Sequence, residues 1–303
     1  MEISYPGAVA PARSRFVRSL GLRIHVCEWG DPEAEPVVLT HGFYDHARGF
    51  DLLAPRLAER YRVLAIDSRG HGDSDWADEY SWPTDILDVI HVLRDLGRPA
   101  HLVGHSRGGG LATDAAILDP DSVRKLANLD GFGPPEEGFE IPGRTHETRT
   151  PPENLALYLD WRQRSAARSG FRPAPDVGVL AERRQAQNPR LSLDWLRYFA
   201  SAGSRHTEDG YVWKFDPFAG RVMGPFRPEW IAPNWTRMRV PMLAVVGGVP
   251  DTWGPLPEPM LSKRLAHVPR LDRAVVEDAG HFMHIEKPEA TARLILDWLE
   301  DTA

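Results

Sequence analysis

Short apolar segments, rich in β-branched residues and bounded by turn residues, recur along this chain and alternate with segments of helical spacing. The apolar segments are predicted strands, and they lie at residues 16–17, 23–29, 36–40, 62–66, 101–104, 124–129, 240–247 and 274–277. Helical spacing is found at residues 83–96, 107–118, 257–266 and 288–300. A strand followed by a helix and a second strand makes a right-handed crossover within a parallel sheet. The sequence therefore predicts a doubly wound α/β fold, with a mostly parallel eight-stranded sheet that opens on an antiparallel hairpin at its edge.

The alternation stops after the sixth predicted strand. From residue 133 to residue 235 the chain is rich in Pro and Arg, shows no clean buried strand and has helical spacing at 154–167 and 191–202. Five of the chain's ten tryptophans fall in this segment, namely Trp161, Trp195, Trp213, Trp230 and Trp235. We expect an α/β core domain made of residues 1–132 and 236–303, with residues 133–235 inserted as a mostly helical cap.

Charge and cysteine content exclude several classes of protein. The 303 residues carry 36 Lys and Arg against 43 Asp and Glu, a formal net charge of −7. Because binding to phosphates needs clustered cations, a nucleic-acid partner is not expected. Cys27 is the one cysteine, so neither a disulfide within the chain nor a cysteine-based metal cluster is expected. No apolar run has the length of a secretory leader or a membrane span, and we expect a cytoplasmic protein without a membrane partner.

A Gly-x-Ser-x-Gly pattern at residues 104–108 is the strongest chemical signal in the sequence. Residues 101–103 form a predicted strand directly before it, and residues 109–112 open a predicted helix directly after it. This context is typical of a nucleophile elbow, a strained strand-to-helix turn that projects a serine hydroxyl at the edge of the sheet. The flanking glycines leave room for such a tight turn. An ordinary Gly-rich turn is the alternative interpretation, and the context favours Ser106 as a catalytic nucleophile.

A serine hydroxyl needs a base within hydrogen-bond reach, and the base needs a third group to orient it. His281 follows the last predicted strand and is the expected base, with His284 as its rival. Asp251 comes just after the strand at 240–247 and is the expected orienting acid, because the order serine, acid, histidine is that of an elbow hydrolase. Asp130, which ends the sixth strand, is the alternative acid, although its favoured role is that of a turn aspartate.

Two backbone N–H groups must face the negatively charged oxygen that forms during acyl transfer. Arg107, the residue after the nucleophile, is expected to supply one of them. Phe43 is expected to supply the other, because it follows the strand at 36–40 and its neighbour Gly42 allows a close backbone approach. His41 could serve as a second base, but a histidine that bonds within its own loop is the favoured interpretation.

Together these residues resemble the α/β-hydrolase superfamily, in its capped branch of esterases and lipases. The resemblance covers the chain outside the insertion. Residues 41–43 are similar to the family's His-Gly oxyanion motif, and residues 67–74 resemble its Asp-x-Arg-Gly-x-Gly-x-Ser turn. Ser106, Asp251 and His281 match the family's nucleophile, acid and base in type and order. The family's haloalkane dehalogenases and epoxide hydrolases carry aspartate as the nucleophile, so the serine argues against both reactions.

The resemblance implies a serine hydrolase that cleaves carboxylic esters of short to medium acyl chain through an acyl-enzyme intermediate, with no cofactor and no metal. A small, largely apolar ester is the expected partner, because Phe43 and the aromatic residues of the insertion favour an apolar pocket. Carbon–carbon bond hydrolysis, lactone hydrolysis and cofactor-free haloperoxidase or perhydrolase chemistry remain open on the same residues. A non-hydrolytic ligand-binding module also remains open. A metal-dependent hydrolase that uses His41, Asp45, His46 and His71 is disfavoured, since no second carboxylate completes a site there.

Overall fold

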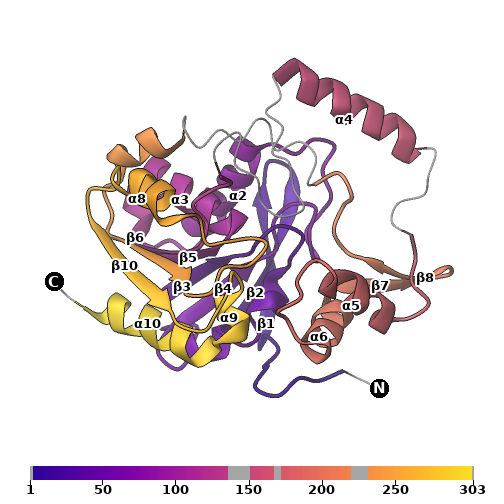
Figure 1. The fold of residues 1–303 in the computed structure, drawn as a ribbon, viewed down its shortest axis with the longest axis horizontal. Coiled ribbons are helices and arrows are strands. Elements are labelled where there is room, and N and C mark those ends of the chain that lie inside the picture. The colour runs from indigo at the N-terminus through magenta and orange to yellow at the C-terminus, as the bar shows by residue number, and fades with distance from the viewer. Residues whose placement is uncertain (1–2, 136–150, 167–171, 220–230, 302–303) are drawn as a thin grey trace.

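The computed structural model describes residues 3–135, 151–166, 172–219 and 231–301 (Figure 1). Its eight-stranded sheet has the spatial order β1-β2-β4-β3-β5-β6-β9-β10. The strands are β1 (Arg13–Ser19), β2 (Leu22–Trp29), β3 (Pro36–Thr40), β4 (Arg62–Ile66), β5 (Ala100–His105), β6 (Val123–Leu129), β9 (Met242–Gly247) and β10 (Leu271–Val276). β2 pairs antiparallel with β1 and with β4, and the other neighbouring pairs are parallel. The predicted doubly wound, mostly parallel sheet of eight strands is confirmed.

The antiparallel edge begins with a tight turn between β1 and β2. Leu20 and Gly21 both have a positive φ, of 48° and 84°, which is the backbone conformation of a two-residue hairpin turn with the twist of its strands. Ser19 pairs directly with Leu22 across this turn. The predicted edge hairpin is therefore confirmed.

Helices cover both faces of the sheet, and the side chains of β3 show how the two layers arise. The helices and short 3₁₀ helices outside the insertion are α1 (Ala54–Leu57), α2 (Trp82–Asp95), α3 (Arg107–Leu118), α8 (Glu258–Leu265), α9 (Met283–Glu286), α10 (Pro288–Glu300), η1 (Ala47–Phe50) and η2 (Pro120–Ser122). Val38 packs into one apolar cluster with α2 and α3, whereas Val37 and Leu39 pack into a second cluster with α1 and α10. Figure 1 shows α2, α3 and α8 on one side of the sheet and α9 and α10 on the other. β3 is buried and almost entirely apolar because both of its faces are covered.

The helix boundaries follow signals that are visible in the sequence. α3 and α10 have the predicted bounds, and α2 begins one residue earlier than predicted. Ser81 caps α2, because its hydroxyl accepts the Thr84 N–H while the Thr84 side chain bonds the Ser81 backbone. Among the described residues, none of the helices combines the length and the apolar character that crossing a bilayer requires.

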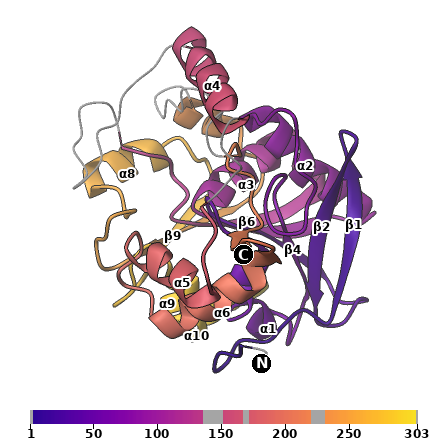
Figure 2. The same ribbon diagram turned by 90° about the vertical axis from the view of Figure 1, so that its right-hand side faces the viewer.

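Between β6 and β9 the chain leaves the sheet and forms several further elements. They are α4 (Pro151–Ala166), α5 (Val177–Gln185), α6 (Leu193–Gly203), β7 (Ser204–Thr207), β8 (Gly210–Trp213) and η3 (Ala232–Arg237). Of these, α4 lies apart from α5 and α6 (Figure 2). The insertion after the sixth strand and its helices α4 and α6 are confirmed. The structure differs by adding α5 and the antiparallel pair β7 and β8, whose short and partly polar strands lack the apolar run that marks a buried strand. The division into a core domain and a cap at residues 133 and 235 stays a prediction.

The described tryptophans of the insertion are packing residues. Trp195 and Trp213 are buried in a third apolar cluster, which α6 and β8 form against the core. Trp235 is buried in the cluster on the α2 and α3 side of the sheet. Trp230 and the side chain of Trp161 lie outside the described residues. The three described side chains thus stabilise the packing of the insertion on the core.

Candidate active site

Ser106 occupies the turn between the end of β5 and the first residue of α3. Its backbone has φ 54° and ψ −123°, a conformation that costs a non-glycine residue about 1 to 3 kcal/mol. The Ser106 N–H donates to Leu129 O at 2.9 Å, which holds the turn against β6. The side chain is partly exposed between buried neighbours. The structure thus forms the strained strand-to-helix turn that the Gly-x-Ser-x-Gly pattern predicts.

Gly104 and Gly108 permit this turn because neither position has space for a side chain. A Cβ on Gly104 would lie 2.5 Å from Gly108 O, and a Cβ on Gly108 would lie 2.2 Å from Thr40 O. Both obstructing atoms belong to the backbone, which cannot move aside as a flexible side chain can. The start of α3 is therefore packed against the end of β3, next to the loop that carries Phe43.

His281 lies in the loop between β10 and α9, and its imidazole meets a buried carboxylate. Nδ1 of His281 is 2.6 Å from Oδ2 of Asp130, and both side chains are almost fully buried. Asp130 directly follows β6, the strand between β5 and β9, so it starts from the same edge of the sheet as Ser106. The structure therefore joins the predicted base to the alternative acid.

Asp251, the predicted orienting acid, contacts the backbone of His281 and not its imidazole. Oδ2 of Asp251 accepts the His281 N–H at 2.7 Å, and Oδ1 accepts the N–H groups of Trp253 and Gly254 at 2.7 and 3.2 Å. The predicted pairing of Asp251 with the imidazole is therefore wrong. Gly254 makes room for the bond between Asp130 and His281. A Cβ at this position would lie 2.0 Å from Asp130 Oδ2 and would collide with the carboxylate.

The charges around His281 favour its protonated form. Burial by itself would lower the pKa of His281, but the hydrogen bond and the charge of Asp130 raise it, and the charges of Asp251 and Asp45 raise it further. The net result is a pKa above the ordinary value of a histidine. An imidazolium that forms here is thus stabilised, as a general base requires when it accepts a proton.

His284, the rival base, has a different environment. Its ring centroid lies 4.3 Å from that of His105, and burial, followed by the charge of His281, lowers the pKa of His284 to about 3. His105 donates from Nε2 to His281 O at 2.9 Å, and burial lowers the pKa of His105 as well. Two neutral imidazoles therefore pack beside His281, and the geometry favours His281 over His284 as the base.

The two predicted oxyanion donors, Phe43 and Arg107, lie on the segments that Gly108 brings together. Arg107 is the first residue of α3, so its N–H has no acceptor within the helix. Its guanidinium pairs with Asp85 and lies over the Trp82 ring, 5.9 Å from the centroid. The side chain of Arg107 thus contacts residues of α2, whereas its backbone N–H lies in the turn directly after Ser106. That Phe43 and Arg107 bind an oxyanion stays a prediction.

His41 bonds within its own surroundings, as expected. Its Nδ1 donates to Gly42 O at 2.7 Å, and its Nε2 accepts the Ser68 N–H at 3.0 Å. Burial lowers the pKa of His41. Because both ring nitrogens are used, the structural interpretation of His41 is confirmed and a second catalytic base is not supported.

The four residues considered for a metal-dependent hydrolase do not converge on an ion site. His41 has the two partners just described, and each of the others also bonds to the protein. The partners are Arg184 for the Asp45 carboxylate (2.5 Å), the carbonyl of Phe199 for His46 Nε2 (3.1 Å) and the carbonyl of Arg69 for His71 Nδ1 (3.0 Å). The disfavoured metal hypothesis therefore gains no support.

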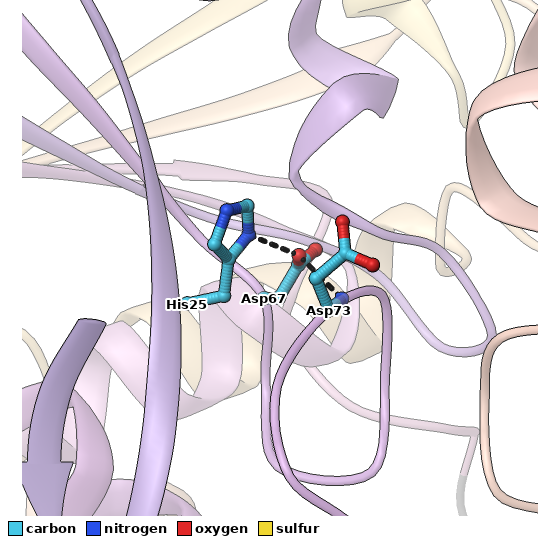
Figure 3. Close-up of side chains that lie close together, drawn as sticks. All are labelled: His25, Asp67 and Asp73. Atoms are coloured by element: carbon cyan, nitrogen blue, oxygen red, sulfur yellow. Dashed lines mark hydrogen bonds and ion pairs between the residues drawn. The ribbon is translucent and has the colours of Figure 1, made fainter. Parts of the chain in front are cut away.

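A second group consists of His25, Asp67 and Asp73 (Figure 3). Its ligand atoms are close enough together for a metal site, but the side chains are not directed at a common point. Asp67 accepts from His25 Nδ1 at 2.8 Å, from the Asp73 N–H at 3.0 Å and from the Ala47 N–H at 2.7 Å. Figure 3 shows the Asp73 carboxylate directed away from Asp67, and it pairs with Lys214 at 2.8 Å. Protein donors thus satisfy Asp67, which anchors the turn that it begins.

Sequence reasoning missed Asn128, a buried amide within β6. Its Oδ1 accepts the Gly131 N–H at 2.7 Å, and its Nδ2 donates to Thr113 Oγ1 at 3.0 Å. Asn128 therefore ties the turn that carries Asp130 to α3. The available signal was a polar residue within the apolar second half of the strand, since buried polar groups are normally hydrogen-bonded.

A sequence profile of the alpha/beta hydrolase family matches residues 37–294. The chain belongs to the alpha/beta hydrolase family. The resemblance to the α/β-hydrolase superfamily is thereby confirmed, and the sheet order and the insertion after β6 agree with it.

Individual relatives of this alpha/beta hydrolase have names that refer to different substrates. Bifunctional epoxide hydrolase 2 of Rattus norvegicus is 26% identical, over 92% of this chain and 54% of that protein. The (E)-2-((N-methylformamido)methylene)succinate hydrolase of Acinetobacter baylyi is 26% identical, over 92% of this chain and 94% of that protein. A solved thioesterase domain from the curacin biosynthetic pathway has a TM-score of 0.78 at 26% identity, covering 94% of this chain and 98% of that domain. The chain spans about half the length of the epoxide hydrolase, and the three names do not agree on one substrate.

Replacing Gly108 with Ala should damage both stability and the proposed activity. The new Cβ would meet Thr40 O at 2.2 Å, and forcing the backbones apart should cost about 1 to 3 kcal/mol of unfolding free energy. Gly49→Ala is the matched control, because a Cβ there meets only the Phe199 ring, at 3.5 Å. Thermal melting and ester turnover of both variants test this, and a Gly108→Ala protein equal to wild type would contradict the packing argument.

The activity should depend on pH through the protonation of His281. A base must be neutral to accept a proton, and the pKa of His281 is raised, so kcat/KM should increase about tenfold per pH unit below an apparent pKa above about 6.5 and level off beyond it. Initial rates of hydrolysis of a neutral ester, measured across a series of pH values, give this profile. A flat profile between about pH 5 and pH 9 would show that His281 is not the base.

Proposed function

We propose that this alpha/beta hydrolase is a serine hydrolase that cleaves carboxylic esters of short to medium acyl chain through an acyl-enzyme intermediate. Ser106 is the nucleophile, His281 is the general base, and Asp130 is the acid that orients the base. The observation that carries the proposal is the buried bond of 2.6 Å between His281 Nδ1 and Asp130 Oδ2, at the sheet edge where the strained turn presents Ser106.

The bond to Asp130 selects the tautomer of the base. An ionised carboxylate only accepts hydrogen bonds, so Nδ1 of His281 carries the proton and Nε2 keeps the lone pair that takes the proton of the Ser106 hydroxyl. The serine oxygen bonds to the ester carbonyl carbon, and negative charge moves to the carbonyl oxygen. The N–H groups of Phe43 and Arg107 stabilise that oxyanion.

Two further steps complete the cycle. When the tetrahedral intermediate collapses, the alcohol leaves with the proton from Nε2, and the acyl group stays on Ser106. A water molecule then attacks the acyl carbon while His281 accepts its proton, and the acid leaves as the serine recovers its hydrogen. Asp130 keeps its charge throughout and stabilises the imidazolium each time it forms.

The nucleophile favours acyl transfer over epoxide opening. The match to an epoxide hydrolase covers 92% of this chain, but that reaction in this family uses an aspartate at the position of Ser106. The match to a thioesterase domain supports acyl chemistry. Thioesters and lactones react through the same acyl-enzyme, and perhydrolysis would proceed through it with peroxide in place of water. The thioesterase match therefore favours ester cleavage within this group of related reactions.

Aromatic side chains beside the proposed oxyanion donor support a small apolar substrate. The rings of Phe43 and Tyr44 have centroids 4.0 Å apart, and Tyr44 lies 4.6 Å from Phe215 of the insertion. All three side chains are only half-buried, so they offer apolar surface next to the reacting carbonyl. Arg184 of the insertion is already paired with Asp45 at 2.5 Å, so its charge is not available to an anionic substrate.

A panel of p-nitrophenyl esters of increasing acyl length tests this function. Wild-type protein should turn over acetate to octanoate esters, and Ser106→Ala should lower kcat by about 10⁴ to 10⁶ because the nucleophile is lost. Ser122→Ala, at the opposite end of β6, is the matched control and should keep full activity. Turnover that survives in Ser106→Ala, or a protein that hydrolyses neither these esters nor thioesters, would reject the proposal and leave a binding module as the better description.

Asparagine in place of Asp130 tests the acid. The variant should lower kcat by about 10⁴, since the amide allows the wrong imidazole tautomer and removes the charge that stabilises imidazolium. Asp121→Asn changes an exposed aspartate and serves as the control for loss of one negative charge. If Asp130→Asn retained wild-type kcat, a different residue would have to orient His281.

A further inference from the structure

Asp251 is a second carboxylate at the proposed active site, and the catalytic cycle gives it no part. It lies half-buried in the loop after β9, and its two oxygens accept three backbone N–H groups. Hydrogen bonds to a charged acceptor are about twice as strong as neutral ones. Asp251 thus holds two separate stretches of main chain, one that begins at Trp253 and one at His281.

Both stretches touch the bond between His281 and Asp130. A Cβ on Gly254 would lie 2.0 Å from Asp130 Oδ2 and 3.2 Å from His281 Nδ1, so the Gly254 backbone packs against the imidazole and its acid. On the other side, a Cβ on Gly280 would lie 2.3 Å from Asp251 Oδ2. The Asp251 carboxylate therefore packs against the main chain at Gly280, and the loop that it holds packs at Gly254 against the other side of the base.

Other contacts keep these two loops folded independently of Asp251. Trp253 Nε1 donates to Gln187 O of the insertion at 2.8 Å. The Gly280 N–H donates to Glu286 Oε1 at 3.1 Å. An isosteric change at Asp251 should therefore shift the base by a small distance without unfolding the loops.

We propose that Asp251 is a positioning residue, which fixes the main chain of His281 and Gly254 so that the imidazole stays aligned between Asp130 and Ser106, and whose charge supports the imidazolium. This inference rests on the proposed function of the site. A shift of about 1 Å in a reacting group lowers a rate by about 10². The expected loss of kcat in an Asp251 variant therefore lies between that of a control variant and that of an Asp130 variant.

The charge of Asp251 also has a measurable effect on the base. Among the described residues, the ionisable groups that act on His281 are Asp130 after β6, Asp251 after β9, Asp45 after β3, His105 on β5 and His284 on α9. Arg190 of the insertion and Glu286 of α9 lie beside Gly280, next to the base, and pair with each other at 2.7 Å. The two neighbouring histidines have lowered pKa values and are neutral, so the three carboxylates supply the stabilising charge. Removing one carboxylate lowers the pKa of His281 and moves the acidic limb of kcat/KM to lower pH.

Two substitutions separate position from charge. Asp251→Asn keeps the shape and removes the charge, whereas Asp251→Glu keeps the charge and lengthens the side chain. Asp176→Asn is the matched control, because Asp176 also accepts a backbone N–H, that of Val179 at 3.1 Å, at the start of α5. The measurements are kcat and KM for p-nitrophenyl acetate across pH, thermal melting, and an NMR titration of the ¹⁵N-labelled His281 imidazole.

Asp251→Asn should lower kcat about 10- to 100-fold with KM nearly unchanged, against about 10⁴ for Asp130→Asn, and should shift the acidic limb to lower pH. Asp251→Glu should lose rate while keeping the wild-type acidic limb, and it decides the positional claim if the Asn variant does not fold. Wild-type kcat and acidic limb in Asp251→Asn would overturn the inference, as would a loss as large as that of Asp130→Asn. The NMR titration reports the effect on His281 even if no ester is hydrolysed, so failure of the proposed function is distinguishable from failure of this inference.

Discussion

The contact of backbone against backbone around Ser106 is the constraint on which the rest of the site depends. Gly108 lets the start of α3 approach the end of β3, and Gly131, next to Asp130, lets the turn after β6 approach Ser106 O, where a Cβ would lie 2.4 Å away. Three strand ends therefore meet at one helix start. Because each approach leaves no room for a methyl group, Ser106, Asp130 and the loop of Phe43 are brought together by the main chain itself.

Two carboxylates contact His281 in different ways, and these contacts determine the chemistry of the proposed site. Asp130 bonds the His281 side chain and Asp251 bonds its backbone. His105 and His284 are equally buried, yet their pKa values are lowered while that of His281 is raised. Burial affects all three rings in the same direction, so the difference comes from the neighbouring acids. Environment, and not residue type, thus distinguishes the proposed base from the other two histidines.

Polar pairs and apolar packing together fasten the insertion to the core. Arg184 of α5 pairs with Asp45 in the loop after β3, and Tyr198 of α6 bonds to buried Asp51. Burial raises the pKa of Asp51 to about 6, although Arg48 and Tyr198 act against this shift. The Asp45 pair lies on the same loop as Phe43, so the position of α5 is coupled to the loop that is proposed to bind the oxyanion.

Local patterns in the sequence determined the fold and indicated two members of the proposed site, Ser106 and His281. The apolar strands, the glycines around Ser106 and the histidine after the last core strand each leave a signal within a few residues, because a strand or a tight turn is specified by its own side chains. The acid left no such signal. Asp130 and Asp251 both follow parallel strands that end at one edge of the sheet, and the local sequence is compatible with either as the partner of His281. Only the tertiary structure decided between them. Asp130 adopts a positive φ, and Gly254 has no side chain to occupy the space that the Asp130 carboxylate needs beside His281. The same holds for β7 and β8, because such short, partly polar strands do not encode the contacts with α5 and α6 that accompany their pairing.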